Sequence, residues 1–310
     1  MINQPYKQIE NGKGAPSPGL QFLIFILLFA GVYILGNILG AVIAEAVYGK
    51  NVITDIMHLK LTSSNVVNVI WLLQFAGVTL PIFAAPVFFA FVIVRDPGDY
   101  LKPTFRFSWL LILLVFGIMF ISNPVIEFLS NLNQKMVLPH WLKWMRTSED
   151  DAQKVMNTIL QMKTIWSLIF NVLFIGLLTA IVEEFMFRGV LQTIFVRWTK
   201  STHAAVWISA ILFSAFHLEF FGFLPRLMLG VLFGYFVAWS GSIWPAVWAH
   251  FLNNGTAVVA TYLFQHKSIK INPDDEQVIS PLGFLFSMVI MLLLLSVYRR
   301  IAAGKKQVPE

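Results

Sequence analysis

The sequence contains no cysteine, and only 12% of its 310 residues are charged. Soluble domains carry about 25% charged residues, so this composition excludes an ordinary soluble enzyme and a disordered chain. The lack of cysteine excludes a disulfide scaffold, thiolate catalysis and zinc sites with cysteine ligands. Apolar residues are abundant instead: 57% are hydrophobic, and the mean hydropathy is +0.73. We therefore expect a polytopic membrane protein whose single helical bundle uses nearly the whole chain.

Eight segments are candidate membrane-spanning helices, because a span needs about 20 predominantly apolar residues. They lie near residues 20–44, 68–94, 107–128, 163–187, 203–218, 222–240, 243–265 and 279–298. The fifth and sixth are short and carry His217 and Arg226 at or near their ends, which favours positions inside the bundle. The predicted fold is an all-α transmembrane bundle of about eight spans with an intramembrane polar cavity.

The chain divides into four expected parts. These are a flexible cytoplasmic tail at 1–19, N-terminal helices and a polar loop at 20–162, a helical core at 163–265, and a C-terminal helix with a basic tail at 266–310. No cleavable signal peptide is apparent, since the apolar run after residue 20 is too long for one. Within the polar loop, residues 131–162 are typical of an interfacial amphipathic piece, which we favour over a substrate lid.

The net charge of +6 predicts the orientation in the membrane. With eight spans both termini lie on one side, and that side collects 12 basic and 4 acidic residues, whereas the opposite side has 10 of each. Basic residues concentrate on the cytoplasmic side of membrane proteins. Both termini are therefore expected in the cytoplasm, with the protein in the cytoplasmic (inner) membrane, and the basic excess needs no nucleic-acid partner.

One cluster of charged residues lies where a lipid-facing helix would not carry it. Glu183, Glu184 and Arg188 follow 19 uncharged residues, 164–182. Ionisable groups inside spans are by default candidates for function. Glu184 and Arg188 are four residues apart, so they can form an ion pair on one helix face. Glu183 points about 100° away and can face a cavity. The alternative is a capped helix end at the membrane interface.

Two further polar clusters lie in later apolar segments. His217 follows Phe213 by one helical turn, and Asn254 follows His250 by the same spacing. Taken alone, each is more typical of a structural histidine or of hydrogen bonding between helices. Glu127, near the outer interface, is interpreted as structural or solvated.

The expected layout brings most of these groups to one end of the bundle. Glu183 and Glu184 are placed at the cytoplasmic end of the fourth helix, and His250 lies near the same end of the seventh. His217 falls toward the opposite end of the fifth segment. It reaches the others only if that segment is tilted, short or re-entrant.

Two carboxylates, two imidazoles and an amide suit the activation of water for hydrolysis of an acyl bond. A carboxylate takes the proton from water, and histidine and asparagine side chains donate hydrogen bonds to the developing oxyanion. Alternatively, Glu183, His217 and His250 could ligate a divalent metal such as zinc. The residues leave both schemes open. His-Glu-x-x-His and Gly-x-Ser-x-Gly motifs are absent, and every Asp lies in an expected loop.

Three motifs in order resemble those of the CPBP family, which includes the CAAX prenyl endopeptidases and bacteriocin-processing or immunity proteins. They are Glu183-Glu184-x-x-x-Arg188, Phe213-x-x-x-His217 and His250-x-x-x-Asn254. The resemblance covers about residues 164–262. It implies that the Glu184–Arg188 ion pair holds the site, and that these helices converge on an intramembrane cavity open to the cytoplasm.

The resemblance also implies roles for the remaining residues. Glu183 would be the general base, His217 its partner on the attacking water, and His250 and Asn254 the oxyanion hole. We favour this glutamate-type mechanism without a cofactor over a metalloprotease, because Asn254 is a poor fourth metal ligand. The expected substrate is a membrane-anchored or amphipathic peptide or protein within the lipid bilayer, of prenylated or leader type.

Two other classes of protein compete with the intramembrane endopeptidase. The chain could be a non-catalytic membrane interaction or immunity protein that keeps the polar cluster for packing. A transporter that uses Glu183 or Glu184 as a proton carrier is a weaker hypothesis, because transporters favour internal repeats and the sequence has no apparent repeat.

Overall fold

The computed structural model describes residues 16–61, 65–270, 272–273 and 279–304. Most of the predicted N-terminal tail, residues 1–15, and the end of the basic tail, residues 305–310, lie outside the described residues. The described part of the chain is helical and contains no strand. The predicted all-α class is therefore confirmed.

Fourteen α-helices and several shorter helical turns follow one another along the described chain. The first half contains α1 (Pro18–Tyr48), α2 (Val52–Met57), α3 (Val66–Gln74), η1 (Phe75–Thr79), α4 (Leu80–Phe88), η2 (Phe89–Ile93), α5 (Pro97–Leu101), α6 (Leu110–Gln134), η3 (His140–Leu142) and α7 (Lys143–Ile159). The second half contains α8 (Ile165–Asn171), η4 (Val172–Leu178), α9 (Thr179–Glu184), η5 (Phe185–Leu191), α10 (Gln192–Thr199), α11 (Thr202–Phe216), η6 (Phe220–Gly222), α12 (Phe223–Ser240), α13 (Trp244–Gln265) and α14 (Pro281–Gly304).

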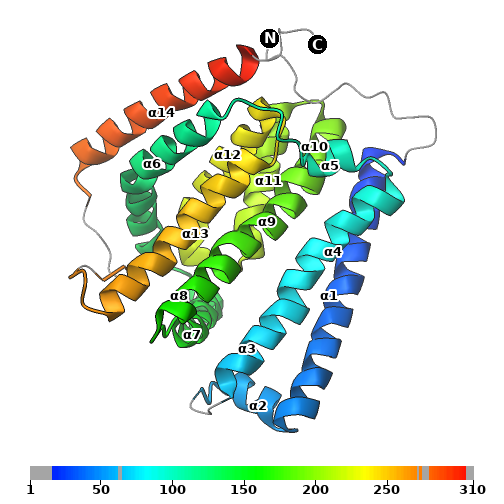
Figure 1. Ribbon diagram of the computed structural model, residues 1–310, viewed down its shortest axis with the longest axis vertical. Coiled ribbons are helices and arrows are strands. Elements are labelled where there is room, and N and C mark those ends of the chain that lie inside the picture. Colours follow the sequence, from blue (N-terminus) through cyan, green and yellow to red (C-terminus); the bar gives the residue numbers. More distant parts are fainter. Residues whose placement is uncertain (1–15, 62–64, 271, 274–278, 305–310) are drawn as a thin grey trace.

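The long helices form one bundle (Figure 1). Helices α1, α3 and α4 lie at one side, α6 and α14 at the other, and α9, α11, α12 and α13 between them. The first turn of α1 and the last turn of α14 lie at the same end of the bundle, which we call the terminal end. Helices α2 and α7 lie at the opposite end, the far end.

Six helical stretches are long and apolar enough to cross a membrane by length and composition. They are Pro18–Tyr48, Val66–Ile93, Leu110–Gln134, Ile165–Thr199, Phe220–Ser240 and Pro281–Gly304. Thr202–Phe216 is a shorter apolar helix, and α13 has 22 residues. Each of the eight predicted segments is thus helical. Many leucines and isoleucines of α1 are exposed, including Leu27 and Leu35, as suits a surface that faces lipid.

The helix that carries the carboxylates is longer than predicted. It begins at Ile165, after the N-cap residue Thr164, whose side chain and that of Ser167 form a reciprocal cap. It continues through η4, α9, η5 and α10 to Thr199. The polar residues after Glu184 predicted that the span ends there, at the membrane boundary. Two of them, Arg188 and Gln192, are instead fully buried. The predicted position of Glu183 and Glu184 at the helix end was therefore wrong. They lie within a 35-residue helix.

Close helix contacts hold this long helix in place. At Gly176, a Cβ atom would lie 3.3 Å from the Cα atom of Gly255 in α13, so two glycines let the backbones of η4 and α13 approach. At Gly189, a Cβ atom would lie 2.7 Å from the carbonyl oxygen of Tyr100, which leaves no room for any side chain. These contacts fix α13 and α5 against the segment that carries the carboxylates.

A polar network joins α5 to α10 at the terminal end. Lys102 is buried, and its Nζ donates to Thr193 Oγ1 at 2.7 Å. Arg197 donates to the Tyr100 hydroxyl at 2.9 Å, and its guanidinium lies 3.2 Å from Asp99 Oδ2. Burial lowers the pKa of Lys102 to about 7, with Asp99 opposing this shift, whereas burial raises the pKa of Tyr100 to about 12. The network therefore holds two ionisable groups that both favour their neutral forms.

The predicted polar loop 131–162 contains the end of α6, the short η3 turn and α7. Most side chains of α7 are polar or charged, and only Ile159 is buried in it. Ile159 packs with Val66 and Ile70 of α3. The predicted amphipathic piece is thus a helix at the far end of the bundle, in contact with α3 and η6.

Candidate active site

Glu184 and Arg188 form the predicted ion pair, and both side chains are fully buried. Arg188 Nη1 lies 2.8 Å from Glu184 Oε1, and Nη2 donates to the carbonyl oxygen of Gly230 in α12 at 3.2 Å. The pair lies where α9 passes into η5, a π-helical segment with a wider turn than an α-helix. Single π-helical turns inside α-helices are frequent at functional sites.

His250 of α13 contacts both carboxylates. Its Nδ1 lies 2.9 Å from Glu184 Oε1, and its Nε2 lies 3.8 Å from Glu183 Oε2. Since a carboxylate only accepts hydrogen bonds, Nδ1 carries a proton and donates it to Glu184. Glu184 therefore orients the imidazole of His250 in addition to binding Arg188. This second contact of Glu184 joins residues 66 positions apart, so helical spacing does not predict it.

His217 follows the last residue of α11 and also faces Glu183. Its Nδ1 lies 2.8 Å from the carbonyl oxygen of Phe213, and its Nε2 lies 4.0 Å from Glu183 Oε2. Because a carbonyl accepts, Nδ1 is the donor, which leaves Nε2 toward Glu183. The difficulty in placing His217 disappears because Glu183 lies inside its helix and not at the terminal end.

Glu183 Oε2 is the point on which the two histidines converge. This oxygen is buried and accepts no hydrogen bond from the described part of the chain. Two imidazole Nε2 atoms face it at 3.8 and 4.0 Å, distances longer than a direct hydrogen bond. Polar groups at such a separation can share a bridging water molecule. The arrangement can therefore hold a water molecule between a carboxylate and two imidazoles.

Asn254 lies one turn after His250 on α13. Its Nδ2 donates to the carbonyl oxygen of Ile175 in η4 at 3.4 Å, and its Oδ1 accepts from Asn253 Nδ2 at 3.1 Å. Asn254 thus faces the long helix that carries Glu183. These contacts fix the orientation of its amide and leave the second Nδ2 hydrogen for another acceptor.

Aromatic rings enclose the charged groups on the α11 and α12 sides. The Arg188 guanidinium carbon lies 4.2 Å from the ring centroid of Phe213 and 5.3 Å from that of Phe233. His250 stacks on Phe233 with centroids 5.2 Å apart. These contacts stabilise the arginine by cation–π attraction and restrict the imidazole of His250.

Arg226 is a further charged residue near the site, beyond the site residues predicted from the sequence. It forms an ion pair with Glu219 and lies close enough to Glu183 and His217 for their charges to interact. The sequence signal was present, since Arg226 is the one charged residue between 220 and 265.

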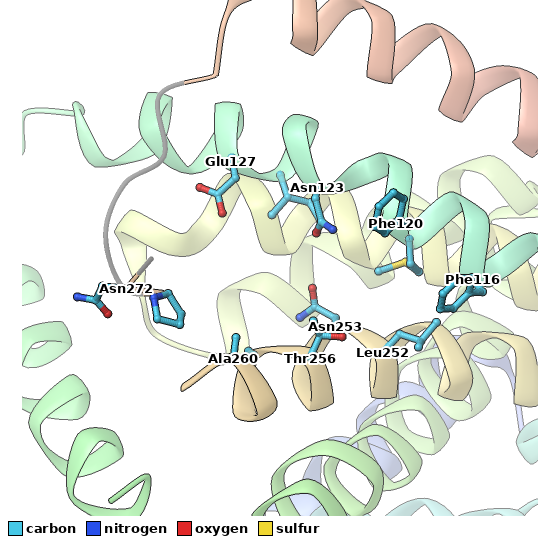
Figure 2. A pocket seen from close by; sticks show the side chains of 13 residues that line it. Phe116, Phe120, Asn123, Glu127, Leu252, Asn253, Thr256, Ala260 and Asn272 are labelled. Carbon is cyan, nitrogen blue, oxygen red and sulfur yellow. The ribbon is translucent and has the colours of Figure 1, made fainter. Parts of the chain in front are cut away.

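A cavity of about 360 Å³ lies between α6 and α13 (Figure 2). Figure 2 shows Phe116, Phe120, Asn123 and Glu127 of α6 opposite Leu252, Asn253, Thr256 and Ala260 of α13. Glu127, predicted to be structural or solvated, lines this cavity. Asn253 lines it too and donates to Asn254, so the cavity borders the candidate site through one pair of amides.

A metal centre is the alternative use of this cluster of carboxylates and imidazoles. Within the described residues, no group of three His, Asp or Glu side chains is arranged to hold a metal ion. Glu183, His217 and His250 are the residues predicted as ligands in the metal-dependent alternative. The cofactor-free mechanism remains a prediction.

The fold and the site define the class of protein: a polytopic α-helical membrane protein in which two buried glutamates, a buried arginine and a buried histidine cluster with the half-buried His217. The family model described as "Type II CAAX prenyl endopeptidase Rce1-like" matches residues 165–256. This stretch contains all three sequence motifs, so the predicted resemblance to the CPBP and CAAX protease family is confirmed. The match supports a CAAX-type intramembrane protease.

One curated relative is described as "Uncharacterized protein YpbD" and comes from Bacillus subtilis (strain 168). It is 30% identical over 113 residues, which are 35% of this chain and 53% of the relative. The chain thus spans about half the length of this relative. No solved structure matches the chain.

Proposed function

We propose that the protein is an intramembrane endopeptidase that activates water with Glu183 and cleaves peptide bonds of membrane-associated substrates. The observation that carries the proposal is the convergence of His217 Nε2 and His250 Nε2 on Glu183 Oε2 at 4.0 and 3.8 Å. In a cluster that serves only packing, buried polar atoms have hydrogen-bond partners. Here the shared oxygen, Glu183 Oε2, is buried and accepts no hydrogen bond from the described residues.

In the proposed first step, a water molecule is held by Glu183 Oε2 and His217 Nε2. Glu183 takes one proton while the water oxygen attacks the carbonyl carbon of the peptide bond. His217 donates Nδ1–H to Phe213, so its Nε2 accepts the second water hydrogen and orients the attacking lone pair.

The negative charge of the tetrahedral intermediate then falls on the former carbonyl oxygen. His250 Nε2 and Asn254 Nδ2 are the proposed donors to it. This role needs hydrogen on both ring nitrogens of His250, because Nδ1–H donates to Glu184 and Nε2–H donates to the oxyanion. Finally Glu183 returns its proton to the amide nitrogen, the carbon–nitrogen bond breaks, and the two peptide fragments leave.

The proposed substrates are membrane-anchored or amphipathic peptides. The matching family is described as prenyl endopeptidases, which supports a prenylated substrate, and leader-type peptides are the second candidate. We further propose that the protein lies in the cytoplasmic membrane with the terminal end toward the cytoplasm, as the distribution of basic residues predicts. No cofactor and no nucleic acid take part in this scheme.

The test is peptide-cleavage profiling of the purified protein in nanodiscs, with wild type and Glu183→Gln side by side, each with and without a strong chelator. Glu183→Gln keeps the shape of the side chain and removes its basicity. The proposal expects cleavage that survives the chelator and is lost in the variant, while both proteins give the same thermal unfolding curve. Loss of cleavage in the chelator would establish the metal-dependent alternative. No wild-type cleavage of prenylated, leader-type and unmodified peptides would favour the non-catalytic interaction protein.

A further inference from the structure

The turn between His217 and α12 is held by side chains from distant parts of the chain. Leu218 has a positive φ of 55°, a conformation that costs free energy for a side chain with a Cβ atom, so the backbone directly after His217 is strained. Strain of this kind persists only where the surroundings hold it. In this turn, residues 218–224, the surroundings are the last turn of α6, helix α7 and Arg226.

Asn133, near the end of α6, bridges the turn with one amide. It is fully buried, and its Nδ2 donates to the carbonyl oxygen of Phe220 at 2.9 Å, while its Oδ1 accepts from the backbone N–H of Leu224 at 2.7 Å. Gly222 precedes α12 and offers no side chain to cap it. Asn133 therefore caps α12 from another helix and holds the turn at Phe220 and Leu224.

Helix α7 contacts the same turn at Phe221. Glu149 Oε2 accepts from the backbone N–H of Phe221 at 3.1 Å, and the Arg146 guanidinium lies 3.2 Å from the centre of the Phe221 ring. Arg146 also donates to Gln134 Oε1 at 3.0 Å. Because the two α7 side chains are three residues apart, they reach the turn from one face of the helix.

Arg226 closes the turn from the side of the candidate site. Its guanidinium packs on Gly222, where a Cβ atom would overlap it, and it pairs with Glu219. The charge of Glu149 also acts on Arg226. Helix α7 thus contacts the turn that Arg226 packs on, and the charge of Arg226 in turn acts on Glu183 and His217.

We propose that Asn133 and Glu149 are positioning residues for His217, and that helix α7 at the far end of the bundle thereby sets the reactivity of the site. This inference rests on the proposed function, because it assigns these residues to the reaction of that site. Neither residue touches Glu183 or the histidines. They act by fixing the strained turn that starts directly after His217.

The competing explanation is that these contacts only stabilise the fold. The two differ in what a substitution changes: a stabilising contact alters the unfolding temperature, whereas a positioning contact alters turnover and the environment of the imidazole. Asp150 offers a matched control, because it is the next residue of α7, carries the same charge as Glu149 and is exposed.

The experiment compares Asn133→Leu, Glu149→Ala, Glu149→Gln and Asp150→Ala with wild type in nanodiscs. The readouts are kcat and KM for a cleaved peptide, the thermal unfolding midpoint, and ¹⁵N NMR spectra of histidine-labelled protein. The His217 signals are assigned by their loss in His217→Gln. Glu149→Gln retains an oxygen that can accept from Phe221, so it serves as the conservative rescue.

For Asn133→Leu and Glu149→Ala we expect kcat to fall by about tenfold to a hundredfold, because small displacements of catalytic groups cost that much. KM should stay within about twofold, since no contact with substrate is removed. The His217 nitrogen signals should shift in both. Glu149→Gln keeps the acceptor for Phe221 and loses only the charge, so its kcat should lie closer to wild type than that of Glu149→Ala, and Asp150→Ala should match wild type. Unchanged kcat and unchanged His217 signals in folded Glu149→Ala protein would overturn the inference.

The NMR readout separates this inference from the proposed function. If wild-type protein cleaves no peptide, the proposed function fails, but a His217 shift in Glu149→Ala and none in Asp150→Ala still establishes the link between α7 and the imidazole. If peptides are cleaved and the His217 signals do not move, the positioning role fails alone. Should Asn133→Leu not fold, Glu149→Ala decides the outcome by itself.

Discussion

His250 Nδ1 lies 2.9 Å from the same Glu184 oxygen, Oε1, that binds Arg188 Nη1 at 2.8 Å. One buried carboxylate oxygen therefore serves an arginine on its own helix and a histidine on α13. The ion pair and the imidazole are coupled through this atom, and a change to one partner alters the charge that the other meets.

Removing either imidazole should damage catalysis as much as removing the carboxylate does. His217→Ala and His250→Ala are each expected to lower kcat by at least about a hundredfold, as loss of acid–base and oxyanion groups does. Peptide cleavage by purified variants beside Glu183→Ala measures this. His203→Ala is the control, because His203 bonds to Tyr235 and not to the carboxylates. A His217 or His250 variant with near-normal cleavage would refute the assigned roles.

Arg188→Ala should destabilise the protein by about 3–5 kcal/mol, because it leaves the charge of Glu184 buried with one partner fewer. Thermal and denaturant unfolding in detergent measure this. The control is Lys154→Ala, which breaks an exposed pair with Asp151 and should leave the unfolding midpoint unchanged. The double variant Glu184→Gln/Arg188→Met should lose less stability than Arg188→Ala, and equal losses would argue against an ion pair as the cause.

Lys102 should make stability depend on pH. Burial lowers its pKa from 10.5 to about 7, so between these pH values the unfolded chain binds a proton that the folded protein does not. The free energy of unfolding therefore rises with pH from about 7 toward 10.5, and this gain is absent below pH 7. Asp96, Asp99 and Arg197 are the charged groups that act on Lys102.

The measurement is the unfolding midpoint of wild type and Lys102→Met from pH 6 to about 11, which covers the pKa of Lys102 and the onset of Tyr100 ionisation. The variant should lose the upward slope, so the two curves should converge or cross as the pH rises. Above pH 10, Tyr100, with its pKa raised to about 12, should lower stability in both proteins, because only the unfolded chain then loses its phenolic proton. Parallel curves between pH 7 and 10 would contradict the role of Lys102.

Gly189→Ala should cost about 1–3 kcal/mol, since it forces the long helix away from the backbone of α5. The new Cβ atom would lie 2.7 Å from the carbonyl oxygen of Tyr100, which has no flexible end that could move aside. The matched control is Gly117→Ala in α6, where no atom lies within 4 Å. There alanine should raise stability by about 0.4–1 kcal/mol through lower entropy of the unfolded chain. Equal unfolding midpoints for the two variants would disprove the close contact.

The membrane class, the all-α fold and the candidate residues could be predicted from the sequence. Hydropathy is a local property, so runs of apolar residues identify spans before any packing is known. Charged and imidazole groups inside such runs stand out for the same reason, because they are costly in lipid. The spacing of Glu184 and Arg188 also predicted their ion pair, because helical periodicity alone brings them together.

Other features depend on contacts between segments that are far apart in the sequence. The predicted length of the helix that carries Glu183 was wrong. Polar residues such as Arg188 and Gln192 are typical of a membrane boundary, but here they are buried against backbone carbonyl groups of α12. The same error separated His217 from Glu183 in the predicted layout. The hydrogen bond from His250 to Glu184 joins residues 66 positions apart. The hydrogen bonds of Glu149 and Asn133 with the turn after His217 join residues 72 and 91 positions apart.

Sequence by itself therefore determined that the chain lies in a membrane and which ionisable residues are candidates for the site. Both follow from residue type and local periodicity. Tertiary structure alone decided which oxygen of which glutamate meets which imidazole nitrogen, and which distant helix holds the turn beside His217. The physical reason is that hydrogen bonds act over about 3 Å, a scale set by the packing of helices and not by their order in the chain.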